Sequence, residues 1–180
     1  NYRGISIVGL LGKLTEIALK SDIEDAVKSK QSELQFGFTS NLSPLCAALI
    51  VSEAMYEARD LKEPIYIAFL DAKKAFDTVD HDILFSRLEQ VGVNPHFWLL
   101  LKSWYNNLTS KVYWKPNQSR AFQVTQGVRQ GGVLSTSLYK VYINLLLDLF
   151  QSHNILLGFH IRSNYVEAPT CAGDVALILS

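Results

Sequence analysis

One segment sets narrow limits on the fold, because an apolar run leads directly into the carboxylate of Asp71. Residues 65–70 are continuously apolar, and Glu63-Pro64 marks a break before them. A short apolar run bounded in this way predicts a buried β-strand, so the Asp71 side chain should emerge at the end of a sheet. Near the other end of the chain, Gly173-Asp174 predicts a two-residue turn into the apolar residues 175–179. This pattern is typical of a tight β-hairpin.

If these two strands are neighbours, Asp71 and Asp174 meet at one end of the sheet. Two carboxylates at a sheet edge offer the hard oxygen ligands that Mg²⁺ prefers, with waters and substrate phosphates completing its octahedron. Two such ions about 4 Å apart can activate an attacking hydroxyl group and stabilise a leaving pyrophosphate. The plainer interpretation is that Asp71 caps a strand and that Gly173-Asp174 is an ordinary turn. Spacing alone leaves both interpretations open.

The remaining local signals predict alternating helices and strands. The capping box of residues 21–24 predicts a short helix to about Lys30. Ser43-Pro44 predicts a helix to about Asp60, with Leu45, Leu49 and Met55 on its buried side. The other predicted elements are helices over 80–91, 94–108 and 135–153, a hairpin of 111–114 and 121–125 across a turn at 116–119, and strands over 158–162 and 166–171.

The region between residues 90 and 147 contains no acidic residue, although the whole chain has 17 basic and 17 acidic side chains. The balanced total argues against a general polyanion binder. Basic side chains interleaved with aromatic rings nevertheless suit phosphate contact and base stacking. The plainer interpretation is that the rings form the core and that the bases face solvent. The candidates for contact with nucleic acid are Lys111, Lys115, Arg120 and Arg129.

The segment 127–132 is a glycine-rich bend before a predicted helix. Its glycines have the backbone freedom to approach a ligand closely, and Arg129 and Gln130 supply donors beside a helix N-terminus that favours anions. It is not a Walker loop, since no Gly-Lys-Ser/Thr follows, and it is not a dinucleotide fingerprint.

Length and composition limit the remaining classes. A chain of 180 residues suggests one domain, or one and a piece. The longest strictly apolar run has seven residues, 45–51, whereas a membrane helix needs about 20, so we expect no membrane span. Two cysteines exclude an internal disulfide framework and weakly favour a reducing compartment. The chain starts at Asn1 and stops within an apolar segment, so we expect a fragment of a longer protein.

Taken together, these segments resemble the reverse transcriptase domain of LINE-like, non-LTR retrotransposons, in order and over nearly the whole chain. Residues 69–81, Phe-Leu-Asp-Ala-Lys-Lys-Ala-Phe-Asp-Thr-Val-Asp-His, are similar to the first catalytic motif of the palm. Residues 127–135 are similar to the motif that positions template and nucleotide, and residues 168–177 to the second catalytic motif. Residues 1–6 and 35–38 resemble two motifs of the fingers.

The resemblance implies an α+β fold with mostly helical fingers over residues 1–62 and a palm over 63–180. The palm has an antiparallel sheet backed by helices, is truncated after the catalytic hairpin, and lacks the thumb that would follow it. The implied activity is RNA-directed DNA polymerisation, in which two Mg²⁺ ions assist transfer of dNTPs onto a primer 3′-hydroxyl. The implied partners are an RNA template and a DNA primer, in the nucleus or cytoplasm.

The resemblance also implies roles for single residues. Asp71 would bind both metal ions with help from the carbonyl group of Ala72, and Asp174 would be the second aspartate of the hairpin pair. Phe76 would exclude a ribose 2′-hydroxyl group. The residues implied to contact the nucleotide are Arg3, Ala72, Phe76, Gln130 and Gly131.

Three departures from the family pattern leave the activity open. Gly173 stands where the family has the first aspartate of the hairpin, Thr136 replaces a proline, and Thr39 replaces a basic residue. Three hypotheses follow: a polymerase domain, a non-catalytic relic or domesticated palm that at most binds nucleic acid, and another metal-dependent phosphoryl-transfer enzyme such as a nuclease. Gly173 is the feature that separates the first hypothesis from the second.

Overall fold

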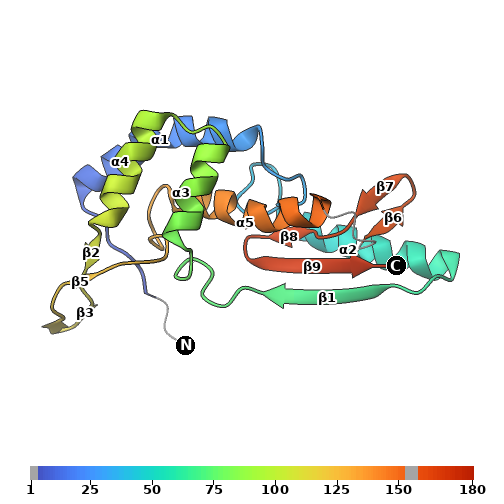
Figure 1. Ribbon diagram of the computed structural model, residues 1–180. Helices are drawn as coiled ribbons and strands as arrows, with labels where there is room; N and C mark the ends of the chain where they lie inside the picture. The colour runs from blue at the N-terminus through green and yellow to red at the C-terminus, as the bar shows by residue number, and fades with distance from the viewer. Residues whose placement is uncertain (1–3, 153–157) are drawn as a thin grey trace. The chain divides into compact units, whose positions relative to one another are not determined.

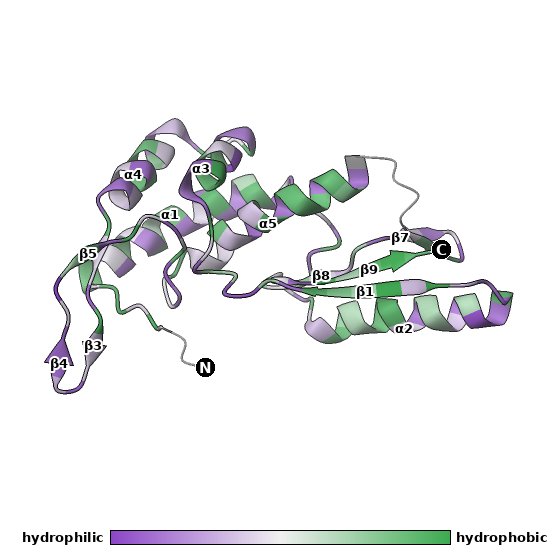
Figure 2. Ribbon diagram, turned by 60° about the horizontal axis from the view of Figure 1, so that its bottom comes forward, coloured by the Kyte–Doolittle hydropathy of each residue, from purple (hydrophilic) through white to green (hydrophobic). Residues whose placement is uncertain are grey.

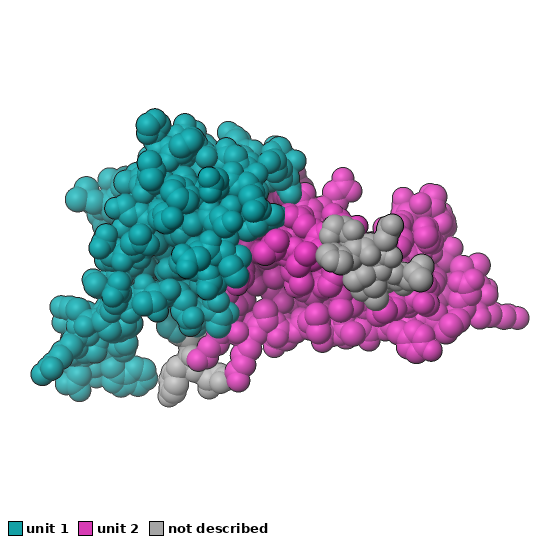
Figure 3. Space-filling view, in the orientation of Figure 1, with its two compact units in different colours: residues 1–30, 76–138 teal, residues 31–75, 139–180 magenta. Residues whose placement is uncertain are grey.

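The computed structural model describes residues 4–152 and 158–180, and the chain divides into two compact units. Unit 1 contains residues up to 30 together with 76–138, and unit 2 contains residues 31–75 together with 139–180 (Figure 3). Within the described ranges, no helix is both long enough and apolar enough to cross a membrane.

Unit 1 is mainly helical, and local capping signals set its helix ends. Asp80 accepts a hydrogen bond from the Ile83 amide at 2.9 Å, and Asn94 accepts one from the His96 amide at 2.9 Å. The predicted starts of helices at residues 80 and 94 are therefore confirmed, with these two side chains as N-caps. The elements are α1 (Leu10–Lys28), α3 (His81–Gln90), α4 (Pro95–Asn106), and the two-residue strands β2 (Thr109–Ser110), β3 (Tyr113–Trp114), β4 (Asn117–Gln118) and β5 (Phe122–Gln123) (Figure 1).

The prediction that a helix begins at residue 21 is wrong, because α1 runs through Ser21 without a break. Leu19, Ile23 and Val27 are buried at intervals of four residues, so one apolar stripe continues across the capping box. Burial of that stripe outweighs the local capping signal.

The predicted hairpin is confirmed, but its turn lies earlier in the chain than predicted. Trp114 pairs with Asn117, so the turn residues are Lys115 and Pro116 rather than 116–119. Proline has no N–H to give to a ladder, which favours its place in the turn. The outer ladder joins β2 to β5.

Unit 2 is built on a three-stranded antiparallel sheet in the order β1 (Tyr66–Asp71), β9 (Asp174–Leu179), β8 (Thr170–Cys171). Figure 2 shows β1 and β9 side by side as largely apolar strands. The other elements are α2 (Pro44–Leu61), the hairpin of β6 (Phe159–Ile161) and β7 (Asn164–Val166), and α5 (Ser135–Ser152), whose first four residues belong to unit 1. The expected combination of helices with an antiparallel sheet is confirmed.

Helices cover both faces of β9, the central strand of this sheet. Val175 packs with Leu147 of α5, whereas Ile178 packs with Ala54 and Ala58 of α2. Val175 and Ile178 are an odd number of residues apart, so their side chains point to opposite faces. Strand β9 is therefore held between α5 and α2.

Two burial predictions in unit 2 are wrong. Helix α2 forms as predicted, but Leu45 is 77% exposed and Leu49 and Met55 are also exposed, because α2 buries Ala47, Ala54 and Ala58 instead. Small side chains let the helix approach the sheet closely. Strand β1 is mostly exposed rather than buried, since it pairs only with β9 in the described sheet.

Candidate active site

Asp71 and Asp174 stand opposite each other in the sheet of unit 2. Asp71 is the last residue of β1 and Asp174 is the first residue of β9, and the antiparallel register pairs them directly. Directly opposed residues of an antiparallel pair point to the same face, with Cβ atoms about 4.5–5.5 Å apart. Both residues are exposed. The structure thus brings together the two carboxylates that the sequence predicted at one end of the sheet.

The hairpin before β9 turns one residue earlier than predicted. Its turn residues are Ala172 and Gly173, and Asp174 already belongs to β9, where it pairs with Cys171. The Gly173 carbonyl accepts a hydrogen bond from the Ala72 amide at 3.2 Å. This bond ties the turn to the residue that follows Asp71.

The charge of Asp174 affects two neighbouring side chains. Burial, and then the Asp174 carboxylate, raise the pKa of Tyr139 to about 12. The same two causes raise the pKa of the Cys171 thiol. The face that carries the carboxylates therefore keeps its neighbouring phenol and thiol in their neutral forms near pH 7.

Phe76 and the glycine-rich bend meet in unit 1 through their backbones. The Val128 amide donates to the Phe76 carbonyl, and the Gly127 amide donates to the Val79 carbonyl, both at 2.7 Å. Gly127 has φ +89°, and a Cβ atom there would lie 2.8 Å from the Asp77 carbonyl oxygen. The conformational freedom predicted to serve a ligand is used at Gly127 for a close approach within the protein.

Gln130 and Gly131 lie beside the first described residues of the chain. The Ser6 amide donates to the Gln130 carbonyl at 2.8 Å. Gly131 has φ +103°, and a Cβ atom there would lie 3.2 Å from the Ser6 carbonyl oxygen. Arg3, the other residue implied to contact the nucleotide, lies outside the described residues, as does His153 at the predicted end of α5.

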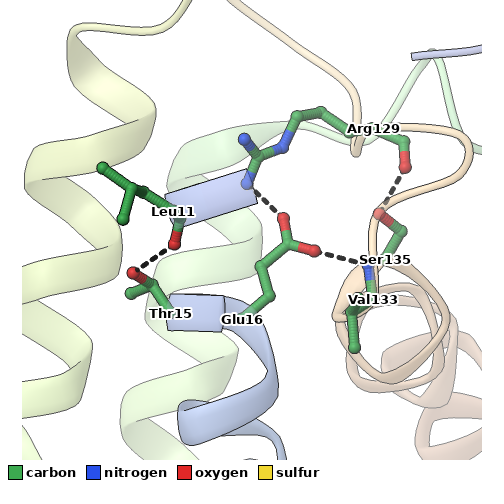
Figure 4. A network of polar contacts seen from close by, with 6 residues as sticks. All are labelled: Leu11, Thr15, Glu16, Arg129, Val133 and Ser135. Atoms are coloured by element: carbon green, nitrogen blue, oxygen red, sulfur yellow. Dashed lines mark hydrogen bonds and ion pairs between the residues drawn. The ribbon is translucent and has the colours of Figure 1, made fainter. Parts of the chain in front are cut away.

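Arg129 is anchored inside unit 1 (Figure 4). Its Nη2 atom lies 2.5 Å from Oε1 of Glu16, and its guanidinium carbon lies 4.2 Å from the centroid of the Trp104 ring. The second Glu16 oxygen accepts the Val133 amide, and the Ser135 hydroxyl donates to the Arg129 carbonyl. With only 13% of its side chain exposed, Arg129 fixes the bend to α1, and its predicted contact with nucleic acid stays a prediction.

The other basic candidates differ from Arg129 in their exposure. Lys111, Lys115 and Arg120 are all exposed on the hairpin of residues 109–123. The same hairpin exposes Tyr113 and Trp114, whereas Tyr105 is buried in unit 1. Exposed rings close in sequence to exposed bases fit the stacking interpretation on this hairpin, and the core interpretation holds at Tyr105.

Sequence reasoning missed three residues that support these sites: Glu16, Gln35 and Tyr139. Each is buried, and each lies in or beside a segment that the motifs had singled out. Glu16 carried no signal in the sequence, because its partner is 113 residues away. Gln35 was noted only as part of the motif 35–38, and its contact with Ala172, 137 residues away, was not predicted. Tyr139 was counted only among the aromatic residues of the acid-free region.

The reverse transcriptase (RNA-dependent DNA polymerase) family matches residues 1–166 of this chain. The chain belongs to the reverse transcriptase family. The predicted relationship to non-LTR retrotransposon enzymes is confirmed, and it favours a polymerase domain, active or inactive, over a nuclease.

Several relatives of this reverse transcriptase domain are retrotransposon proteins. It is 32% identical over 146 residues to the RNA-directed DNA polymerase from mobile element jockey of Drosophila melanogaster, covering 79% of this chain and 16% of that protein. It is 27% identical over 153 residues to the Pol polyprotein of the R2 element of Popillia japonica, covering 84% of this chain and 21% of that protein. The domain thus spans about a fifth or less of these relatives.

Solved structures share the fold of this reverse transcriptase domain. Apo telomerase from Candida tropicalis matches with a TM-score of 0.62 and 16% identity, covering 93% of this chain and 34% of that one. Telomerase from Candida albicans, solved with a fragment of telomeric RNA, matches with a TM-score of 0.54 and 14% identity, covering 94% of this chain and 30% of that one.

Proposed function

We propose that this chain is the nucleotidyl-transfer part of a retrotransposon RNA-directed DNA polymerase, with Asp71 and Asp174 as its metal-binding pair. The observation that carries the proposal is the direct register of these two carboxylates at one end of the β1–β9 pair. The relatives that are named RNA-directed DNA polymerases support an RNA template, a DNA primer and dNTPs as the substrates.

The donor set fits one Mg²⁺ ion better than two. Mg²⁺ is commonly bound by one or two carboxylates while it keeps several waters, and Asp71, Asp174 and the Ala72 carbonyl group offer such a set. Among the described residues, no group of three or more His, Cys, Asp or Glu side chains gathers where it could hold a metal ion. When bound, the metal would stabilise the charge that develops on the transferred phosphoryl group.

The remaining roles follow the family resemblance. Phe76 would lie against the sugar and exclude ribonucleotides, and Gln130 and Gly131 would position nucleotide and template. Lys111, Lys115 and Arg120 would hold the nucleic-acid backbone, supported by their exposure on the hairpin that also exposes Trp114. We also propose that Arg3 contacts the nucleotide. Residues 1–62 would form mainly the fingers, and residues 63–180 mainly the palm.

Gly173 should impair this copy. It occupies the position of the family's shared metal ligand, so a second ion would lack a carboxylate between the two metal positions. A loss of about 4 kcal/mol of metal-based charge stabilisation slows a reaction about a thousandfold. The same glycine supports a second candidate function, that of a non-catalytic or domesticated domain that binds nucleic acid without polymerising.

The two candidates differ in primer extension. The experiment places residues 1–180 in a complete polymerase and compares the native sequence with Gly173→Asp/Tyr139→Phe on an RNA template. The second change makes room for the carboxylate, because a Cβ atom at position 173 would lie 2.9 Å from the Tyr139 hydroxyl oxygen. Slow extension by the native form and fast extension by the variant would support an impaired polymerase. Equal, rapid extension by both forms would contradict the assignment of Gly173, and no extension by either form would favour the non-catalytic domain.

A further inference from the structure

A buried glutamine contacts the turn of the candidate catalytic hairpin. Gln35 is 0% exposed, and its Oε1 atom accepts the Ala172 amide at 3.0 Å and the Gly37 amide at 2.8 Å. Its Nε2 atom donates to the Ala172 carbonyl at 3.3 Å. A single carboxamide therefore bridges both peptide groups of one turn residue.

The backbone around Gln35 brings its side chain to this position. The Phe36 amide donates to the Thr170 carbonyl at 2.7 Å, and the Thr170 amide donates to the Leu34 carbonyl at 2.8 Å. These bonds lay residues 34–36 alongside β8. Gly37 completes the approach, because a Cβ atom at that position would lie 2.1 Å from the Ala172 amide nitrogen.

Ala172 has a backbone conformation that needs support. Its φ is +58°, in the left-handed region that residues with a Cβ atom rarely adopt. Such a residue persists only where the surrounding structure holds it. Gln35 accepts a hydrogen bond from the Ala172 amide and donates one to the Ala172 carbonyl, and these two bonds fix the peptide groups on both sides of this strained position.

We propose that Gln35 is a positioning residue for the metal pair. By holding Ala172, its carboxamide sets the path of the turn, so that Asp174 enters β9 in register with Asp71. The consequence for metal binding rests on the proposed function of this pair. The effect on the turn itself depends only on the contacts of Gln35.

Amide hydrogen exchange measured by NMR tests the effect on the turn. Gln35→Met keeps the length of the side chain and removes its hydrogen bonds. Exchange at the Ala172 amide should become about tenfold faster, as expected when one hydrogen bond is removed, while the Ile178 amide of β9 stays protected. Gln151→Met is the matched control, because that amide donates instead to Ser32 and should leave Ala172 unchanged.

Two results would overturn the proposal. One is unchanged exchange at Ala172 in Gln35→Met. The other is equal acceleration at Ala172 and Ile178, which would mean that Gln35 only stabilises unit 2 as a whole. If the variant does not fold, the native protein still provides a test: the side-chain amide protons of Gln35 should exchange more slowly than those of the exposed Gln118, and equal rates would reject the contact.

Metal binding separates this proposal from the proposed function. Mn²⁺ titration should show weaker binding in Gln35→Met than in the native chain, because the turn no longer holds Asp174 in register with Asp71. Absence of Mn²⁺ binding by the native chain would overturn the metal assignment of Asp71 and Asp174. The exchange result at Ala172 would still decide whether Gln35 holds the turn.

Discussion

A Cβ atom added at Gly173 would lie 2.9 Å from the hydroxyl oxygen of Tyr139. Tyr139 is buried on α5, and the Cβ atoms of Ala72 and Ala75 would also lie close, at 3.1 and 3.2 Å. An aspartate at position 173 therefore needs the Tyr139 ring to move by a few tenths of an ångström. The phenol therefore occupies space that an aspartate side chain at position 173 would use.

We expect Gly173→Asp alone to destabilise the protein, and removal of the phenol oxygen in Gly173→Asp/Tyr139→Phe to recover much of the loss. Overpacking of this kind costs about 1–3 kcal/mol. Urea unfolding of both variants measures the difference, with Tyr139→Phe alone as the control. Equal stabilities of the single and double variants would show that the hydroxyl group does not oppose the aspartate.

Arg129→Ala should lower the free energy of unfolding by about 3 kcal/mol, because it leaves the buried Glu16 carboxylate without its partner. The matched control is Arg59→Ala, whose exposed pair with Asp60 should contribute less than about 1 kcal/mol. Denaturant titration measures the free energy of unfolding of both variants. Similar small losses of this free energy in both would mean that the Glu16–Arg129 pair does not anchor the bend.

The hairpin of residues 109–123 should carry part of any binding to an RNA–DNA duplex. Changing Lys111, Lys115 and Arg120 to Ala should weaken affinity and make its salt dependence less steep, by roughly 0.7–0.9 in slope for each phosphate that is no longer neutralised. Fluorescence anisotropy across a salt series measures this, with Lys62→Ala as an exposed control in unit 2. A salt slope that does not change in the triple variant would exclude a role for these side chains in phosphate binding.

Stability should fall as the pH rises through the titration of Glu167. Burial raises the pKa of this carboxyl group, although a hydrogen bond from Tyr165 acts in the opposite direction. The folded protein then holds this proton more tightly than the unfolded chain does. The stability contributed by protonated Glu167 is therefore complete below the pKa of this group in the unfolded chain, and it is lost as the pH rises above the pKa in the folded protein. Glu167→Gln should remove this loss and be the more stable form at neutral pH. Denaturant unfolding between about pH 4 and pH 7 checks the prediction, and parallel pH profiles for both forms would reject it.

Local signals predicted much of the fold because their physical causes are local. Asp80 and Asn94 cap their helices through amides two or three residues away. The pairing of Asp71 with Asp174 could also be predicted, since each carboxylate adjoins an apolar strand. The buried face of α2 could not be predicted, because its alanines become buried only against a sheet whose strands lie elsewhere in the sequence. The contacts of Gln35 and Glu16 were missed for the same reason.

Direct measurement of Mn²⁺ binding tests the central claim that Asp71 and Asp174 form a metal-binding pair. Water-proton relaxation should detect weak binding to the native chain, a loss of at least about tenfold in affinity in Asp71→Asn and in Asp174→Asn, and tighter binding in Gly173→Asp/Tyr139→Phe. Asp82→Asn, in the first turn of α3, is the control and should leave the affinity unchanged. Binding that is equally strong in the native chain, Asp71→Asn and Asp174→Asn would contradict the claim.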